Sequence, residues 1–248
     1  RPRNRGQVTF CPVKERALEL GIPVLQYEKV SREGVDDIRA LNPDVIVTAA
    51  FGQMLSREFL EIAPYGVINV HASLLPKYRG SSPIQWAVVN GETETGITIM
   101  KTAYKMDSGD IITQKEVAIG EDETAGELFE KLSRAGAPEL VKALDLLEDG
   151  KATFTPQDES KATYFPMLKK EDGEVDFSLP AHDVVCRVRG FNPWPSAFTS
   201  AGGKRIKIFK AAVVEGKGKP GEVIAAERDG ITVACGDNAV KITELQPE

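Results

Sequence analysis

The chain has 248 residues, of which 42% are hydrophobic, enough for one large domain or two modest ones. Charged residues make up 27%, and there is no run of about 18 apolar residues, so the composition excludes a membrane-spanning chain and indicates a soluble globular protein. A formal net charge of −6 argues against a protein that coats nucleic acid over its whole surface.

The first half of the chain alternates helix and strand patterns. A proline in the first turn and a glycine after the last turn predict a helix over residues 12–21. Apolar runs rich in β-branched residues then predict four strands, over residues 44–50, 66–72, 97–103 and 111–119.

Capping residues predict the helices around these strands. Ser56 caps a short helix, and Ser82 with Pro83 opens a second one that stops near residue 90. A Thr-x-x-Glu capping box at Thr124 opens a helical stretch to residue 149, which we expect to break near residues 136–138 at a glycine and a proline. Strands separated by helices predict an α/β fold with a Rossmann-like, mostly parallel sheet covered on both faces.

The pattern changes after Gly150. Residues 151–170 lack periodicity and are interpreted as a linker, and a short helix is predicted near residues 180–189. From residue 196 onward, short strands separated by glycine turns predict a small antiparallel, OB-like β-barrel. The predicted organisation is therefore an α/β domain over 1–150, a linker over 151–170 and a barrel domain over 171–248.

Cysteine usage indicates the cellular compartment. Cys11, Cys186 and Cys235 are far apart in the chain and form no C-x-x-C pair. This is typical of reduced thiols in a cytoplasmic protein, and it favours neither a disulfide framework nor a zinc site. We expect no metal.

One strand end carries candidate chemistry. His71 lies at the end of the strand over 66–72, two residues after Asn69, so both side chains are expected on the same face. Ligands of open α/β sheets bind at the carboxyl ends of strands. On position alone, a buried histidine bonded to a backbone carbonyl remains an equal alternative. The other histidine, His182, is interpreted as solvated surface without a role.

Asp107 lies in a glycine-containing loop between two predicted strands. Such a loop lets the backbone approach a ligand and presents a carboxylate, although a plain turn aspartate is the alternative. An amide, an imidazole and a carboxylate together suit acyl transfer to an amine, because the amine itself attacks the carbonyl carbon. The protein then has to stabilise the oxyanion and remove a proton. Opposite charge favours the charged form of a histidine, which could face the oxyanion beside the Asn69 amide.

The sequence of residues 69–80, Asn-Val-His-Ala-Ser-Leu-Leu-Pro-Lys-Tyr-Arg-Gly, resembles the signature of folate-dependent formyltransferases. Asp107 with Gly109 is similar to the second motif of that family. The resemblance implies that Asn69, His71 and Asp107 are catalytic and that 10-formyltetrahydrofolate is the formyl donor. It also implies a folate site formed by Phe51, Gly52, Gln53, Met54, Leu55, Ser73, Leu74, Leu75, Pro76, Tyr104 and Met106.

Two more segments resemble the methionyl-tRNA formyltransferases of that superfamily. Residues 191–195, Phe-Asn-Pro-Trp-Pro, are similar to the motif that opens their C-terminal barrel, a stiff corner with an apolar anchor. Residues 1–6 resemble their arginine-rich tRNA loop, with Arg5 at the position of its key arginine. Against that family, the chain lacks the β-α-β unit that precedes this loop and stops short at its C-terminal end.

The resemblance implies initiator methionyl-tRNA as the acceptor. The cations expected to bind its phosphates are Arg1, Arg3, Arg5, Lys77, Arg79, Lys204, Arg205 and Lys207, although a solvated charged surface is the alternative for each group. The leading hypothesis is a monomeric, cytoplasmic enzyme that formylates this tRNA. A sister enzyme that formylates a small amine or hydrolyses the donor is a second hypothesis, and a non-catalytic RNA-binding module is a third.

Overall fold

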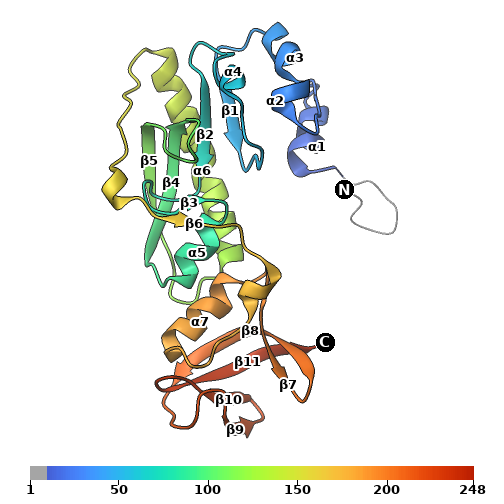
Figure 1. Cartoon of the computed structure of the whole chain (residues 1–248), viewed down its shortest axis with the longest axis vertical. Coiled ribbons are helices and arrows are strands. Elements are labelled where there is room, and N and C mark those ends of the chain that lie inside the picture. The colour runs from blue at the N-terminus through green and yellow to red at the C-terminus, as the bar shows by residue number, and fades with distance from the viewer. Residues whose placement is uncertain (1–9) are drawn as a thin grey trace.

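A four-stranded sheet forms the centre of the N-terminal half of the computed structural model, which describes residues 10–248 (Figure 1). Its order is β1-β2-β4-β5. The strands are β1 (Ile46–Ala49), β2 (Val67–His71), β4 (Glu94–Lys101) and β5 (Ile111–Ala118). All four fall on strands that apolar patterning predicts, because runs of β-branched residues pack well in a buried sheet.

The sheet is mixed rather than mostly parallel. β1 and β2 run parallel, whereas the pairs β2–β4 and β4–β5 are antiparallel. A loop of only nine residues, 102–110, joins β4 to β5, and so short a connection allows only an antiparallel pair. The Rossmann-like α/β class is confirmed, and the expected dominance of parallel pairs does not hold within residues 10–248.

Of the helices described in this half, four start where the sequence predicts a helix, and the two short helices within residues 30–40 have no predicted counterpart. The helices are α1 (Pro12–Glu19), α2 (Val30–Glu33), α3 (Val35–Ala40), α4 (Arg57–Leu60), α5 (Pro83–Val89) and α6 (Ala125–Glu148). The Ser56 hydroxyl accepts a hydrogen bond from the Phe59 amide at 3.1 Å, and Thr124 with Glu127 forms the predicted capping box.

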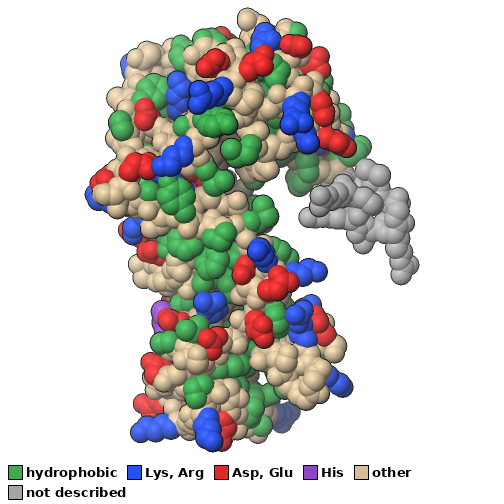
Figure 2. Space-filling view, viewed as in Figure 1, with side chains coloured by type: hydrophobic (Ala, Val, Ile, Leu, Met, Phe, Trp, Pro, Cys, Tyr) green, Lys and Arg blue, Asp and Glu red, His purple; other side chains and the backbone are tan. Residues whose placement is uncertain are grey.

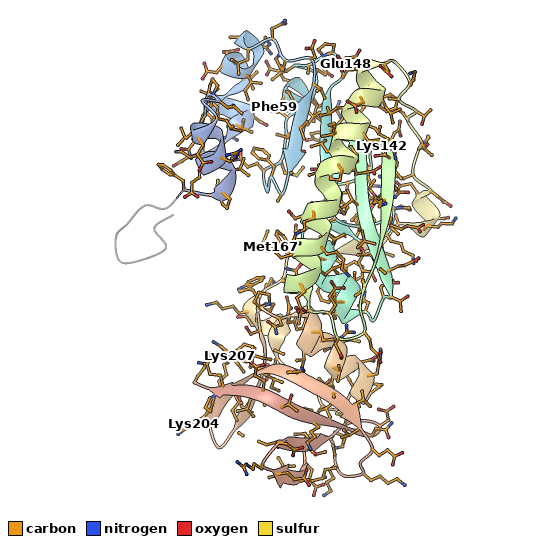
Figure 3. All side chains as sticks on the ribbon, turned by 180° about the vertical axis from the view of Figure 1, so that it is seen from behind. Phe59, Lys142, Glu148, Met167, Lys204 and Lys207 are labelled. Atoms are coloured by element: carbon orange, nitrogen blue, oxygen red, sulfur yellow. The ribbon has the colours of Figure 1, made fainter. Side chains whose placement is uncertain are left out.

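The long helix α6 lies along one face of the sheet, as Figure 3 shows from behind. Leu128 and Leu132 on this helix pack with Ile97 and Ile99 of β4 in the main core. The predicted break near residues 136–138 is wrong, since α6 is continuous for 24 residues. Gly136 is buried on the sheet side of α6, and the packing of this helix on the sheet offsets the hydrogen bond missing at the internal proline.

Residues 151–170 are not a free linker. Strand β6 (Tyr164–Phe165) pairs in parallel with β3 (Arg79–Gly80), and Thr155 bridges to Ile111 at the start of β5. Two short 3-10 helices, η1 (Glu159–Lys161) and η2 (Lys170–Gly173), lie in or directly after this segment. It is therefore attached to the α/β domain, and the domain boundaries remain a prediction.

The C-terminal half is a five-stranded antiparallel sheet with one helix packed on it. Its order is β7-β8-β11-β10-β9, and α7 (Ala181–Gly190) packs against it. The strands are β7 (Ala197–Ala201), β8 (Lys204–Val214), β9 (Val223–Glu227), β10 (Gly230–Ala234) and β11 (Ala239–Pro247). Within residues 10–248, β7 and β9 form the two edges of this sheet, so the hydrogen bonds form an open five-stranded sheet and do not close the predicted barrel.

The corner at residues 191–195 joins the two halves. Phe191 is fully buried, and its ring lies edge-on to Trp86 of α5 with 6.2 Å between centroids. The Gly126 amide donates to the Asn192 carbonyl, and the Arg189 guanidinium donates to the Gly120 carbonyl. These contacts fit the structural role expected for the corner.

Candidate active site

The end of β2 presents an amide and an imidazole side by side along one strand. Asn69 pairs in register with Thr48 of β1, and the Thr48 hydroxyl donates to the Asn69 side-chain oxygen Oδ1 at 2.9 Å. Because that oxygen is held as an acceptor, the amide nitrogen of Asn69 is the atom left to donate.

His71 makes one contact to the backbone and one to a carboxylate. Its Nε2 lies 2.9 Å from the Tyr78 carbonyl oxygen, which can only accept, so Nε2 carries a hydrogen. The other ring nitrogen, Nδ1, lies 3.9 Å from Asp107 Oδ2. The imidazole is therefore buried and bonded to a backbone carbonyl, and it also lies next to Asp107. The two alternatives for His71, a buried histidine and a histidine at the candidate site, do not exclude each other.

Asp107 is held from its own loop and from the loop after β2. Its φ of 48° lies in the left-handed region, which aspartate and asparagine tolerate better than most residues. The Gly80 amide donates to Asp107 Oδ2 at 2.8 Å. A Cβ at Gly109 would lie 1.7 Å from the Lys101 carbonyl oxygen, so only glycine allows this loop to fold back onto β4. The predicted triplet is thus brought to one strand end.

The loop between His71 and Arg79 is internally bonded. The Ser73 hydroxyl donates to the Lys77 carbonyl at 2.7 Å, and the Thr98 hydroxyl donates to the Ser73 carbonyl at 2.6 Å. The side chains of Ser73 and Leu75 are buried, and so is that of Leu55 in a separate small core. These three predicted folate residues can offer a ligand little beyond backbone atoms.

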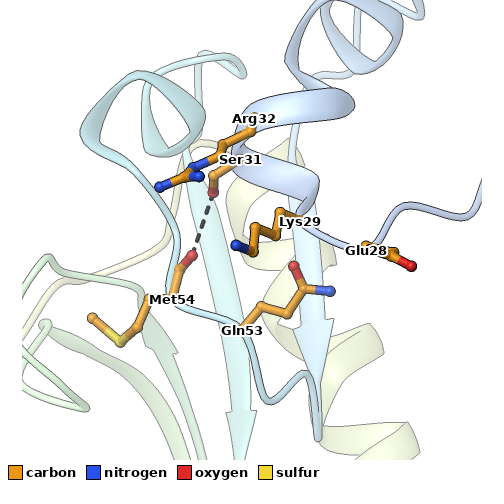
Figure 4. A pocket seen from close by; sticks show the side chains of 6 residues that line it. All are labelled: Glu28, Lys29, Ser31, Arg32, Gln53 and Met54. Atoms are coloured by element: carbon orange, nitrogen blue, oxygen red, sulfur yellow. Dashed lines mark hydrogen bonds between the residues drawn. The ribbon is translucent and has the colours of Figure 1, made fainter.

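The remaining predicted folate residues lie nearer the surface. Those with exposed side chains are Phe51, Gln53, Met54, Tyr104 and Met106. Gln53 and Met54 line a hollow with Glu28, Lys29, Ser31 and Arg32, where the Ser31 hydroxyl donates to the Met54 carbonyl (Figure 4). A second hollow is lined by Leu74, Gln114, Lys115 and Glu116. The predicted catalytic triplet lines neither hollow, and the folate contacts, with Gly52 and Pro76 among them, stay a prediction.

The predicted tRNA-binding cations divide into three groups. Arg79 has no exposed surface, so its interpretation as a phosphate contact is wrong. Lys77 is exposed beside Glu92. Lys204, Arg205 and Lys207 lie on β8, where Figure 3 labels Lys204 and Lys207. The Arg205 guanidinium lies 3.8 Å from the Phe198 ring centroid. The arginines at positions 1, 3 and 5 lie outside the described residues. In Figure 2, basic and acidic side chains are interspersed over the visible face.

Arg79 is buried because the segment after α6 satisfies its guanidinium. Nη1 donates to the Tyr164 hydroxyl at 2.6 Å, and Nη2 donates to Glu159 at 2.7 Å. Nε and Nη2 both donate to the side-chain oxygen of Gln157. The sequence pattern missed these partners, since residues 151–170 carry no periodicity and the contacts span about 80 positions, as for Arg79 and Glu159.

Two side chains near this network have strongly shifted pKa values. Hydrogen bonds from Arg79 and Lys105 lower the pKa of the Glu159 carboxyl to about 2. Burial raises the pKa of Tyr78 to about 12, and its hydrogen bond to Glu92 acts in the same direction. Both groups therefore keep one protonation state near neutral pH.

Glu159→Gln is expected to lower the melting temperature at neutral pH and to make no difference near pH 2. A carboxyl whose pKa is lowered on folding stabilises the protein above its ordinary value of 4.5, and that contribution disappears as the pH falls from 4.5 to about 2. The measurement is thermal unfolding of both proteins across this range. Glu121→Gln, an exposed charge change elsewhere, is the control, and a difference that is constant with pH would contradict the ion-pair explanation.

Among residues 10–248, no group of three or more His, Cys, Asp or Glu side chains is arranged to hold a metal ion. No helix in this part of the chain is both long and apolar enough to cross a bilayer.

The fold is that of a formyl transferase. The formyl transferase family profile matches residues 12–144, and the profile of the formyl transferase C-terminal domain matches residues 167–248. The chain belongs to the methionyl-tRNA formyltransferase family, on the evidence of its curated relatives. Those of Geobacter metallireducens and Bacillus licheniformis are each 48% identical over the whole chain, which spans 80% of their length.

Solved structures agree on the fold. Methionyl-tRNA formyltransferase from Clostridium thermocellum aligns with a TM-score of 0.62 at 21% identity, over 82% of this chain and 88% of that one. An N-formyltransferase from Helicobacter canadensis, in complex with folinic acid and dTDP-3-aminofucose, aligns with a TM-score of 0.73 at 18% identity, over 94% and 82%.

Proposed function

We propose that the protein transfers the formyl group of 10-formyltetrahydrofolate to the α-amino group of methionine on initiator methionyl-tRNA. The observation that carries this proposal is the position of His71 Nδ1, 3.9 Å from the Asp107 carboxylate and two residues along the strand from the Asn69 amide. The relatives named above, methionyl-tRNA formyltransferases at 48% identity, support methionyl-tRNA as the acceptor, and the structure solved with folinic acid supports a folate donor.

In the proposed mechanism the amine attacks the formyl carbon directly, and the bond from that carbon to the folate nitrogen breaks. The attacking nitrogen loses one proton, and the departing nitrogen gains one. The Asn69 amide nitrogen donates to the developing oxyanion, since its oxygen is occupied by Thr48. His71 stabilises the same charge through Nδ1, while Asp107 compensates the imidazolium and takes part in proton removal.

The two substrates would approach from different parts of the molecule. The exposed apolar side chains of Phe51, Met54, Tyr104 and Met106 are suited to a flat heterocycle. Tyr104 and Met106 lie in the loop that carries Asp107. Lys77 and the cations of β8 are suited to phosphates. We further propose that the protein acts in the cytoplasm as a monomer.

The test is transfer of radiolabelled formyl from 10-formyltetrahydrofolate to methionine-charged initiator tRNA by the purified protein. We expect label to appear in the tRNA in proportion to enzyme, and uncharged tRNA to remain unlabelled because it offers no amine. Consumption of the donor without labelled tRNA would overturn the proposed acceptor.

A small amine is the second candidate acceptor, because the fold is shared with a protein solved with a nucleotide-sugar amine. The dependence of the rate on salt concentration distinguishes the two candidate acceptors. Transfer at low tRNA concentration should fall steeply as ionic strength rises, since binding of a polyanion releases counterions. A nucleotide-sugar amine carries only two phosphates, so the rate with such an acceptor would depend on salt much less.

A further inference from the structure

Gln157 lies at the centre of a hydrogen-bond network that joins the segment after α6 to both catalytic loops. Residues 155–165 will be called the strap. The strap pairs with the end of the 73–80 loop through β3 and β6, and at its other end Thr155 exchanges two backbone hydrogen bonds with Ile111. It therefore crosses the sheet edge beside the proposed catalytic pair.

The amide of Gln157 is fully used. Its nitrogen donates to the Asp107 carbonyl at 2.9 Å and to the Gly109 carbonyl at 2.7 Å. Its oxygen accepts from Arg79 Nε at 3.0 Å and from Nη2 at 2.7 Å. A primary amide has two N–H donors and two acceptor lone pairs, so all four are satisfied. One side chain thus fixes the Asp107 loop and Arg79 to each other.

Arg79 carries the same restraint to His71. It lies between Tyr78, whose carbonyl accepts from His71 Nε2, and Gly80, whose amide donates to Asp107 Oδ2. The strap also holds this backbone directly, because the Arg79 amide donates to the Thr163 carbonyl at 2.9 Å. Asp107 is therefore attached to Gln157 through one hydrogen bond, and His71 is attached to it through two, by way of Tyr78 and Arg79. These are the two residues of the 3.9 Å contact.

We propose that Gln157 is a positioning residue, which sets the distance between the His71 imidazole and the Asp107 carboxylate without touching either substrate. This inference rests on the proposed function for its kinetic consequence. A displacement of about 1 Å in a catalytic group can cost about a hundredfold in rate, so the network is sufficient to control turnover.

Gln157→Glu keeps the hydrogen bonds that the side chain accepts from Arg79 and removes those that it donates to the Asp107 loop. A carboxylate can still accept from Arg79, but it donates nothing and places negative charge against the Asp107 and Gly109 carbonyl oxygens. We expect kcat to fall by about 10- to 100-fold, with KM for donor and tRNA changed by less than about threefold. Gln157→Met, which lacks all four bonds but keeps the apolar length, should lower kcat similarly if the charged variant does not fold.

Asp158→Asn is the matched control. Asp158 is the next residue of the strap, and its carboxylate bonds to Ser160 and Lys161 within the strap. Its kcat should stay close to that of the unsubstituted protein. Combination with Asp107→Asn gives a further test: if Gln157 acts through Asp107, the double variant turns over no more slowly than Asp107→Asn alone. Multiplication of the two losses would overturn the positioning role.

A readout without activity keeps the inference independent of the proposed function. The Gly80 amide hydrogen is bonded to the Asp107 carboxylate, so its exchange with solvent reports whether that carboxylate stays in place. In Gln157→Glu its exchange should be faster by about tenfold or more, and unchanged in Asp158→Asn. Equal exchange in Gln157→Glu and the unsubstituted protein would overturn the inference, whichever acceptor the enzyme uses.

Discussion

Asp107→Asn is expected to reduce formyl transfer by about two to four orders of magnitude and to leave folding nearly intact. Asparagine tolerates the left-handed backbone at this position, where φ is 48°, and its side-chain oxygen can still accept from the Gly80 amide. What disappears is the negative charge 3.9 Å from His71 Nδ1. The loss should therefore appear in kcat.

The measurement combines steady-state kinetics with thermal unfolding. Asp110→Asn is the matched control, since it makes the same change three residues along the chain, and it should leave turnover nearly unchanged. A large fall in melting temperature that accompanies the loss of activity in Asp107→Asn would make Asp107 a structural residue and contradict its assignment.

His71→Ala is expected to abolish most of the turnover and also to cost stability. The imidazole is 6% exposed, and its Nε2 hydrogen is the donor to the Tyr78 carbonyl. Leaving a buried acceptor without its donor costs about 1–3 kcal/mol, so the melting temperature should fall as well. Because both effects are expected, activity alone cannot assign the role of His71.

His71→Gln separates the loss of turnover from the loss of stability. The amide of glutamine can donate to the Tyr78 carbonyl, but it cannot accept and release a proton as imidazole does. We expect most of the stability to return and the activity to stay low. His182→Ala is the second control, since that histidine is exposed and its removal should not change turnover. Formylation at the original rate by His71→Ala would contradict the catalytic assignment.

Local features of the sequence predicted the four strands of the main sheet and four helices around it, whereas α2, α3, β3 and β6 have no predicted counterpart. The capping box at Thr124, the serine cap of α4 and the apolar runs of β1 and β2 depend on residues within a few positions of each other. Such interactions are determined by backbone conformation and hydrogen bonding inside one element, so they can be predicted from the sequence without knowledge of the fold. The same is true of the Asn69 and His71 spacing along one strand.

Predictions failed where the deciding interactions were distant in the chain. The family resemblance implies a phosphate contact at Arg79, yet three side chains some 80 residues away bury its guanidinium. The break expected in α6 failed for a related reason, since packing of the helix on β4 outweighs the local effects of Gly136 and Pro138.

By itself the sequence determined the α/β class and the family, and it predicted the triplet, because motifs and periodicity record residue types at fixed spacings. Only the tertiary structure decided that the sheet is mixed, that β6 pairs with β3, and that Gln157 bonds Arg79 to the loop that carries Asp107. Those features consist of hydrogen bonds between segments about 50 to 80 positions apart, whose partners have no spacing rule and meet only when the chain has folded.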